Sequence, residues 1–190
     1  MPKPIPVGVS ARHIHVSRED LDILFGPGYE LTVYKELGQP GQYAANEKVT
    51  LVGPKRQIEN VRILGPVRST SQVELAITDA MALGVNAPIL YSGNLAGSGS
   101  ITVVGPHGTV EMKEKVIVAG RHLHASPAEA AEYGLKDGDL ICIRCGDVRA
   151  VIFEKVLVRV RPDFALEFHI DTDEANAAGV RGGTCKIVRC

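Results

Sequence analysis

The chain has 190 residues, of which 45% are apolar, so it can form one substantial core or two small ones. Its 21 basic and 22 acidic side chains give a formal net charge of −1, which argues against a general nucleic-acid binder. No apolar run approaches the roughly 20 residues that span a bilayer, and residues 1–10 lack the apolar stretch of a signal peptide. The composition therefore predicts a soluble intracellular protein.

The first feature along the chain is a segment that returns as a repeat. Residues 7–17 (VGVSARHIHVS) match residues 116–126 (VIVAGRHLHAS), and both indicate a strand, an Arg-His-X-His-X-Ser motif and the start of a helix. Ser17 precedes two acidic residues, which is typical of a helix N-cap. Ser126 and Glu129 have the spacing of a capping box, with proline at the first helical position. The repeat predicts two related halves.

Elsewhere the strand signal dominates. Runs of β-branched residues predict strands at residues 48–52, 57–64, 100–104, 109–112, 140–144 and 149–160. Gly53-Pro54 and Gly105-Pro106 are expected to close hairpins. Many short strands with few short helices predict a mainly β protein built of barrels rather than a sandwich.

One helix is clear from the sequence, at residues 71–83, and Gly84 is expected to end it. The glycine- and serine-rich residues 92–100 follow as a loop. This loop is either part of a ligand site or a plain connector, and both interpretations stay open.

Four cysteines lie near the C-terminal end of the chain, at positions 142, 145, 185 and 190. In the reducing interior of a cell they predict thiols rather than a disulfide framework. Cys142 and Cys145 form a Cys-X-X-Cys motif, but they lie in an expected strand, whereas a redox pair of this spacing would more often open a helix. We interpret them as core or strand cysteines.

Four of the six histidines lie in the two repeated motifs. Because successive side chains of a strand point to opposite faces, His13 and His15 share one face, as do His122 and His124. Two histidines on one face form the simplest two-ligand metal clip. The repeated context favours a metal role over that of half-exposed strand histidines.

A further histidine lies in residues 165–171, where apolar and polar side chains alternate. The polar face of this expected strand carries Glu167, His169 and Asp171. Beside one clip, His169 would complete a three-ligand zinc site with an open fourth position, and the two acids would then partner the ligand. His169 is equally compatible with a half-exposed strand residue. His107 lies in an expected turn and is interpreted as solvated.

Arg68 directly precedes the helix that is expected from residue 71. A helix N-terminus offers free amide donors and a guanidinium adds a bidentate fork, so this place is a candidate phosphate site. Ser71 and Glu74 have the spacing of a capping box. On the residues alone, we interpret Glu74 as a cap rather than as a metal ligand.

Three stretches together resemble the PduL-type phosphotransacylases, also called phosphate propanoyltransferases: the double Arg-His-X-His-X-Ser motif, residues 68–74 (RSTSQVE) and residues 168–176 (FHIDTDEAN). The resemblance runs from about residue 6 to the C-terminus. It implies two β-barrel domains capped by short α-helices, with the active site between them. We expect residues 1–11 and 120–190 to form the first barrel and residues 12–119 the second. The resemblance also implies a homodimer or a higher homo-oligomer.

The resemblance implies two zinc ions per chain, together with sites for phosphate and coenzyme A. One zinc ion would be held by His13, His15 and Glu74, and the other by His122, His124 and His169. Arg68 would bind phosphate and act as a catalytic residue. Coenzyme A would contact Gly8, Val9, Ser10, Lys55, Arg62 and Asn176, with Arg56 as an alternative to Lys55.

The implied activity converts a short-chain acyl-CoA and phosphate into acyl phosphate and coenzyme A, with propanoyl-CoA as the expected substrate in propanediol degradation. The sequence has no Gly-X-Ser-X-Gly elbow and no cysteine with an evident histidine and aspartate arrangement, so direct transfer is predicted rather than an acyl-enzyme. Two alternatives stay open: a dizinc hydrolase such as a thioesterase, and a non-catalytic barrel module stabilised by zinc.

Location is a further expectation from the resemblance. Several members of the family carry an amphipathic N-terminal extension that targets them to bacterial microcompartments, whereas this chain starts a few residues before its first expected strand. We therefore expect either a cytoplasmic form or a microcompartment protein whose extension has been removed.

Overall fold

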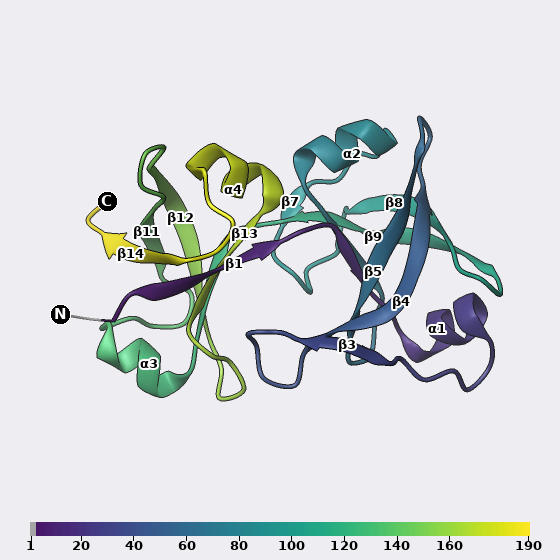
Figure 1. Cartoon of the computed structure of the whole chain (residues 1–190), viewed down its shortest axis with the longest axis horizontal. Coiled ribbons are helices and arrows are strands. Elements are labelled where there is room, and N and C mark those ends of the chain that lie inside the picture. Colours follow the sequence, from purple (N-terminus) through teal and green to yellow (C-terminus); the bar gives the residue numbers. More distant parts are fainter. Residues whose placement is uncertain (1–2) are drawn as a thin grey trace. The chain divides into compact units, whose positions relative to one another are not determined.

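The computed structural model describes residues 3–190 and is mainly β (Figure 1). Contacts divide the chain into two compact units. The terminal unit contains residues 3–10, 38–40 and 120–190, and the central unit contains residues 11–37 and 41–119. The sequence predicts one domain at residues 1–11 and 120–190 and another at residues 12–119. That these domains fold independently stays a prediction. Residues 1–2 lie outside the described residues.

Six strands close into a barrel in the terminal unit. In hydrogen-bonding order they are β1 (Ile5–Ser10), β13 (Glu167–Asp171), β10 (His122–Ala125), β12 (Val151–Val160), β11 (Leu140–Cys145) and β14 (Thr184–Val188). β14 pairs with β1 and closes the ring, and Figure 1 shows these two strands side by side. Helix α3 (Pro127–Glu132) follows β10, and helix α4 (Thr172–Ala178) follows β13.

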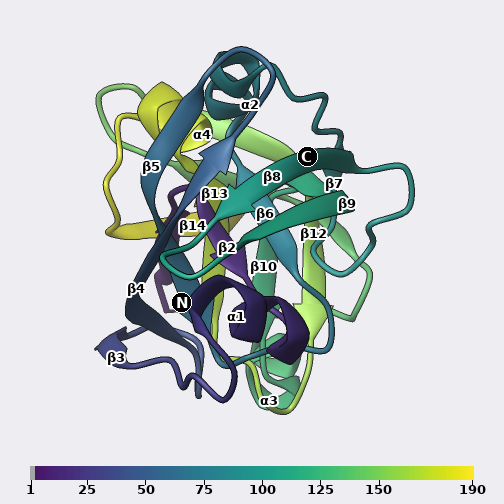
Figure 2. The same cartoon turned by 90° about the vertical axis from the view of Figure 1, so that its right-hand side faces the viewer.

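The central unit has its own closed ring of strands. In hydrogen-bonding order they are β9 (Thr109–Ala119), β6 (Gln72–Leu75), β2 (His13–His15), β5 (Gln57–Gly65), β4 (Tyr43–Val52) and β8 (Gly99–Val104). β8 pairs with both β4 and β9 and closes the ring; Figure 2 shows β8 beside β9. β3 (Val33–Glu36) is added at β4 and β7 (Ile89–Leu90) at β9. Helix α1 (Arg18–Phe25) follows β2, and helix α2 (Ile77–Leu83) follows β6.

The two barrels share one topology. Strands β1, β13, β10, β12, β11 and β14 correspond to β9, β6, β2, β5, β4 and β8, and each neighbouring pair has the same direction in both barrels. β1 precedes β2 along the chain but belongs to the terminal barrel, and β9 precedes β10 but belongs to the central barrel. The predicted internal repeat and the predicted mainly β fold of two barrels with short helices are thus confirmed.

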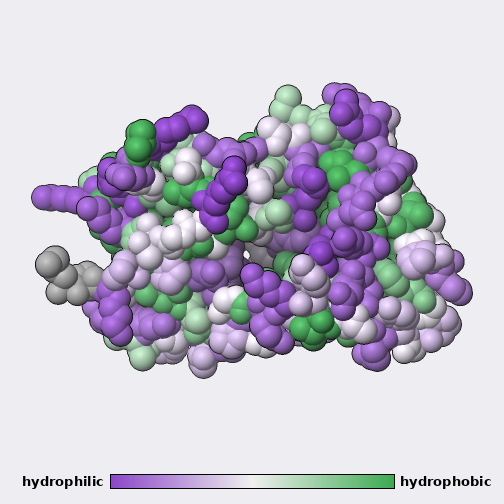
Figure 3. Space-filling view, viewed as in Figure 1, coloured by the Kyte–Doolittle hydropathy of each residue, from purple (hydrophilic) through white to green (hydrophobic). Residues whose placement is uncertain are grey.

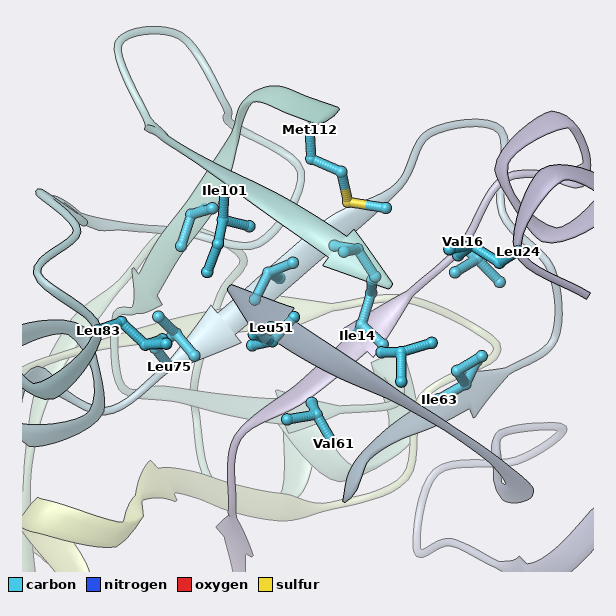
Figure 4. Packing of buried hydrophobic residues seen from close by; sticks show 14 of the residues in the cluster. Ile14, Val16, Leu24, Leu51, Val61, Ile63, Leu75, Leu83, Ile101 and Met112 are labelled. Atoms are coloured by element: carbon cyan, nitrogen blue, oxygen red, sulfur yellow. The ribbon is translucent and has the colours of Figure 1, made fainter. Parts of the chain in front are cut away.

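The barrel interiors explain how the histidine motifs are oriented. Ile14, the middle residue of the first motif, is fully buried and packs with Leu51 and Ile63 (Figure 4). Leu123, the middle residue of the second motif, packs with Phe168 in the terminal barrel. Each such side chain contributes about 1.5–3 kcal/mol when buried. Because side chains alternate, the flanking histidines lie on the opposite face of each strand.

The face of the molecule that Figure 3 shows is predominantly polar. On the face drawn in Figure 3, hydrophobic residues occur in small groups among hydrophilic ones. None of the helices in residues 3–190 is long and apolar enough to cross a membrane. Exposed apolar side chains scattered in this way are normal for a folded chain and mark no interface by themselves.

The helix starts that follow the two repeats are confirmed. Ser17 accepts a hydrogen bond from the backbone N of Asp20 at 3.2 Å, and Ser126 forms a complete capping box with Glu129. Gly84 ends α2 in the left-handed conformation, with φ of 78°. These local signals are strong because the cap bonds join residues only a few positions apart.

The expected helix at residues 71–83 is wrong in its first half. Residues 72–75 form β6, and α2 begins only at Ile77. β6 pairs with β2 on one side and β9 on the other, and its four residues are all buried, so tertiary pairing overrides the local capping pattern. Ser71 accepts a hydrogen bond from the backbone N of Ser17 at 2.8 Å instead of capping a helix. Arg68 therefore does not precede a helix N-terminus.

The expectation of four thiols is also wrong. Cys142 on β11 forms a disulfide with Cys190, with 5.4 Å between their Cα atoms. The reason is long-range pairing, because β14 places Val188 opposite Cys142 and so brings the C-terminal residue beside β11. Cys145 and Cys185 are buried free thiols, as expected for core cysteines.

Candidate metal centres

The first candidate site, the central cluster, consists of His13, His15 and Glu74. Antiparallel pairing of β2 with β6 places Glu74 opposite His13. His13 Nε2 lies 3.5 Å from Glu74 Oε2, and His15 Nε2 lies 3.8 Å from Glu74 Oε1. All three side chains are buried, and one ligand atom from each lies within 4.8 Å of the others. This spacing allows a single ion to reach all three.

Backbone carbonyl groups orient both histidine rings of the central cluster. His13 Nδ1 lies 2.8 Å from the carbonyl O of Ala11, and His15 Nδ1 lies 3.1 Å from that of Leu64. Nδ1–H donates in each case, so the lone pair of Nε2 is left toward Glu74. Burial, followed by the charges of His13 and Arg68, lowers the pKa of His15 to about 3. The ring is therefore neutral near pH 7, which is the metal-binding form.

Two residues that the sequence did not single out hold Glu74. Gln72 Nε2 donates to Glu74 Oε1, and Ser92 Oγ donates to the same oxygen at 3.1 Å. The backbone N of Gly93 donates to Gln72 Oε1 at 2.9 Å, which ties the glycine- and serine-rich loop to β6. The interpretation of Glu74 as a helix cap is wrong. The alternation of apolar and polar residues at 72–75 was the available signal for Gln72 and Glu74.

The second candidate site, the terminal cluster, consists of His122, His124 and His169. β10 and β13 pair so that His122 lies opposite His169. The ring centroids are 4.6 Å apart for His122 and His124, 5.1 Å for His122 and His169, and 4.8 Å for His124 and His169. One ligand atom from each ring lies within 4.8 Å of the others. His169, which sequence left open, thus lies beside the second clip.

His124 provides the best test of whether a metal fits. Both of its ring nitrogens are buried and have no hydrogen-bond partner among residues 3–190. An unpartnered buried polar atom is costly, and coordination to a metal would satisfy one of these nitrogens. Burial, followed by the charges of His122 and His169, lowers the pKa of His124 to about 2, so the ring is neutral. The donor sets of the two clusters both suit zinc.

The remaining terminal ligands have different partners. His122 Nδ1 lies 2.9 Å from the carbonyl O of Gly120, which repeats the bond of His13 to the carbonyl group two residues earlier. Glu167 Oε2 lies 2.8 Å from His169 Nε2, as expected for a partner of this ligand. Asp171 instead caps α4 by accepting from the backbone N of Glu174 at 2.9 Å.

Arg68 lies beside the central cluster. Its backbone N donates to the carbonyl O of Val16 at 2.9 Å, and its backbone forms a parallel bridge with that of Ser17. Its charge contributes to the low pKa of His15. Arg68 therefore lies beside the central cluster because its backbone pairs with the residues that follow the first clip. It does not lie at a helix N-terminus.

Four of the expected coenzyme A contacts lie in the terminal unit. Gly8, Val9 and Ser10 form the end of β1, where Gly8 pairs with His169. Asn176 is exposed on α4. The β1 residues thus lie next to the strand that carries the third histidine.

The other two expected coenzyme A contacts lie in the central unit. Lys55 is exposed in the turn between β4 and β5, as is the alternative Arg56. Arg62 lies opposite His13 in the pairing of β5 with β2, and its guanidinium carbon lies 4.3 Å from the ring centroid of Tyr34. Of Lys55 and Arg62, Arg62 is therefore the residue that lies opposite a member of the central cluster. His107 is exposed in its turn, as expected.

Comparison with known proteins decides the kinship of the chain. Residues 6–181 match the family model described as phosphate propanoyltransferase. The chain belongs to the phosphate propanoyltransferase family. The expected resemblance and the expected enzyme class, an acyltransferase, are confirmed.

Several relatives named phosphate propanoyltransferase align over nearly the whole chain. The protein of Thermotoga maritima is 58% identical, over 94% of this chain and 86% of the relative. The protein of Lachnoclostridium phytofermentans is 55% identical, over 94% and 84%. The protein of Salmonella typhimurium is 54% identical, over 93% and 84%.

Proposed function

We propose that the chain transfers the propanoyl group between coenzyme A and inorganic phosphate by direct transfer, at a site with one zinc ion in each cluster. Family membership supports phosphate acyltransfer, and the relatives' name supports propanoyl-CoA as the substrate. The metal part rests on the buried His124, whose ring nitrogens have no hydrogen-bond partner among residues 3–190. Its histidine cluster has a counterpart on the equivalent strands of the other barrel.

The proposed reaction is a substitution at the thioester carbonyl carbon. A phosphate oxygen forms a bond to this carbon, the carbon–sulfur bond breaks, and the proton of the phosphate passes to the departing thiolate of coenzyme A. The anionic phosphate must approach another anionic substrate, so positive charge is needed at the phosphate site. In the proposed site, beside the central cluster, the guanidinium fork of Arg68 supplies this charge and orients two phosphate oxygens.

The clusters supply the rest of the proposed site. Bound zinc would act as a Lewis acid that offsets negative charge on the substrates. The neutral rings of His15 and His124 present lone pairs without a competing proton. The proposed coenzyme A contacts are Gly8, Val9, Ser10, Lys55, Arg62 and Asn176.

The state of the cysteines supports direct transfer. An acyl-enzyme needs an accessible thiolate or an activated hydroxyl group. Burial raises the pKa of Cys185 to about 12 and also raises that of Cys145. Cys142 and Cys190 are joined in a disulfide. A protein thiol is therefore a poor candidate for carrying the acyl group.

The experiment that tests the proposal follows the products of propanoyl-CoA cleavage with and without phosphate. We expect thioester loss to require phosphate and to yield propanoyl phosphate, and the reverse assay to form propanoyl-CoA. Arsenate should replace phosphate and release free acid, because acyl arsenates decompose in water. Release of free acid independent of phosphate would support the hydrolase alternative and contradict the proposal.

The biological setting is proposed on the same basis. We place the activity in propanediol degradation, in the cytoplasm or in a bacterial microcompartment, with the chain acting as a homodimer or higher homo-oligomer. Light scattering of the purified protein would measure the oligomer mass, and fractionation of purified microcompartments would show whether the protein is enclosed. A monomer would contradict the proposed oligomer, and presence in or absence from purified microcompartments would decide between the two proposed locations.

A further inference from the structure

The carboxylate of Glu167 contacts both a candidate metal ligand and a buried amide. Its Oε2 atom lies 2.8 Å from His169 Nε2 and accepts a hydrogen bond from Gln39 Nε2 at 3.0 Å. Gln39 is only 2% exposed, although it lies in a short segment far from Glu167 along the chain. One carboxylate oxygen thus joins a candidate metal ligand to a buried amide.

Gln39 is itself fixed at both ends of its amide group. Its Nε2 atom donates to the carbonyl O of Ala165 at 3.0 Å, and its Oε1 atom accepts from the backbone N of Ala165 at 3.2 Å. The amide therefore cannot turn without losing two backbone bonds, and its remaining N–H is directed at Glu167. Residues 38–40 belong to the terminal unit through such contacts.

Two glycines leave the space that the carboxylate fills. A Cβ atom added at Gly38 would lie 2.6 Å from Glu167 Oε2, and one added at Gly8 would lie 2.9 Å from Glu167 Oε1. Neither glycine has a φ in the left-handed region, so both backbones would accept alanine. Their small size, rather than their flexibility, is what the carboxylate requires.

The equivalent place in the central barrel carries the complementary chemistry. Glu167 lies opposite His124, and Gln72 lies opposite His15, each two residues before the third ligand of its cluster. In the central cluster an amide donates to a carboxylate ligand. In the terminal cluster a carboxylate accepts from an imidazole ligand. In each cluster, the third candidate ligand is hydrogen-bonded to the residue two positions before it. The acceptor Glu74 has a donor there, and the donor His169 has an acceptor.

We propose that Glu167 is a positioning residue for the terminal metal site, held in place by Gln39 and admitted by Gly8 and Gly38. By accepting a hydrogen bond from His169 Nε2–H, it fixes the tautomer and the ring so that Nδ1 is the nitrogen left to bind metal. The inference rests on the proposed metal function of the terminal cluster. The inference has one distinctive consequence: a substitution of Gly38 should change the metal affinity only by displacing Glu167.

The test is a double-mutant cycle read by zinc affinity rather than by activity. Gly38→Ala, Glu167→Ala and the double variant are stripped of metal and titrated with zinc against a chromophoric chelator. We expect one of the two zinc affinities to fall about 10- to 100-fold in each single variant, because losing an outer partner of a ligand has effects of this size. Adding Gly38→Ala to Glu167→Ala should have no further effect. Glu167→Gln should recover part of the affinity, since its amide oxygen still accepts.

Controls separate positioning from folding. Gln57→Ala removes a glutamine-to-glutamate hydrogen bond of the same kind on the surface, at 2.9 Å to Glu59, and should leave both zinc affinities unchanged. The metal-free thermal midpoint of each variant checks folding, and Gln39→Ala replaces Gly38→Ala in the cycle if that variant does not fold. Wild-type zinc affinity in the single variants, or a full Gly38 effect without Glu167, would overturn this inference alone. A wild-type protein that binds no zinc would instead overturn the proposed metal function.

Discussion

The two barrels have the same strand order, but their candidate metal clusters differ in one ligand. The third position is Glu74 in the central cluster and His169 in the terminal cluster. A carboxylate ligand would cancel part of the charge of a bound dication, whereas an imidazole ligand, which binds metal through an uncharged ring, would cancel none of it. With zinc bound as proposed, the two sites of this duplicated scaffold would differ in electrophilicity. In the terminal unit the negative charge remains nearby, on Glu167, but one hydrogen bond farther out.

Removing one histidine from either cluster should have the largest effect on activity. We expect His15→Ala and His124→Ala each to lower kcat/KM for propanoyl-CoA about 1000-fold, or about 4 kcal/mol, because in the proposed function both clusters bind zinc and serve one reaction. Steady-state rates of thioester cleavage would measure this. His107→Ala, in an exposed turn, is the matched control and should behave like the wild type. A near-normal rate in either cluster variant would mean that its barrel does not take part in catalysis.

A second contrast concerns stability, since the disulfide between Cys142 and Cys190 lies in the terminal unit. We expect Cys190→Ser to lower the unfolding free energy of that unit by about 3 kcal/mol, because the cross-link restricts the unfolded chain. Denaturant unfolding of oxidised protein would measure the change. A reducing agent should reproduce it in the wild type and have no effect on the variant. Equal stability of oxidised and reduced wild type would contradict the prediction.

Arg68 should distinguish the central cluster as the phosphate side of the reaction. Arg68→Lys keeps the charge but loses the planar fork, so we expect kcat/KM for phosphate to fall about 30-fold, or about 2 kcal/mol. The KM for coenzyme A in the reverse reaction should change little. Arg181→Lys, at an exposed position in the terminal unit, is the control. An unchanged dependence of the rate on phosphate would place the phosphate site elsewhere.

The smallest effect concerns a buried acid of the central unit that lies outside the central cluster. Glu47 Oε1 accepts from Thr32 Oγ1 at 2.7 Å and from the hydroxyl group of Tyr29 at 3.0 Å. Burial alone would raise its pKa, but the hydrogen bonds from Thr32 and Tyr29 outweigh burial and lower the pKa below 4.5. The stabilisation is therefore present above pH 4.5 and is lost as the pH falls through the lowered value.

We expect Glu47→Gln to lower the unfolding free energy by about 1–2 kcal/mol at neutral pH, because an amide N–H would face donors. Denaturant unfolding at several pH values would show this difference shrink in acid. A difference that stays constant with pH would contradict a role for the charge. Glu59→Gln, on the surface, is the control.

The sequence predicted the features that depend on neighbouring residues. The two histidine clips followed from the alternation of strand side chains, and the repeat around them indicated two related barrels. Ser17 and Ser126 were recognised as helix caps because their bonds span three residues. His169 was left open on the residues alone, since its place beside His122 depends on how two distant strands pair.

The features that the sequence missed depend on contacts between distant segments. Local capping chemistry at Ser71 suggested a helix, but pairing on both sides makes residues 72–75 a strand. The residues alone do not predict Glu74 as a metal ligand, and only the family resemblance implies that role. Gln39 carried no local signal at all, because its partners Ala165 and Glu167 are more than a hundred residues away. The disulfide to Cys190 was missed for the same reason.

We propose that each barrel binds a metal ion at its own histidine clip. Anomalous diffraction at the zinc absorption edge, from crystals of protein purified without chelators, tests it most directly. We expect one anomalous peak among His13, His15 and Glu74 and a second among His122, His124 and His169. A single peak, or a peak at the cysteines with none at the clips, would contradict it.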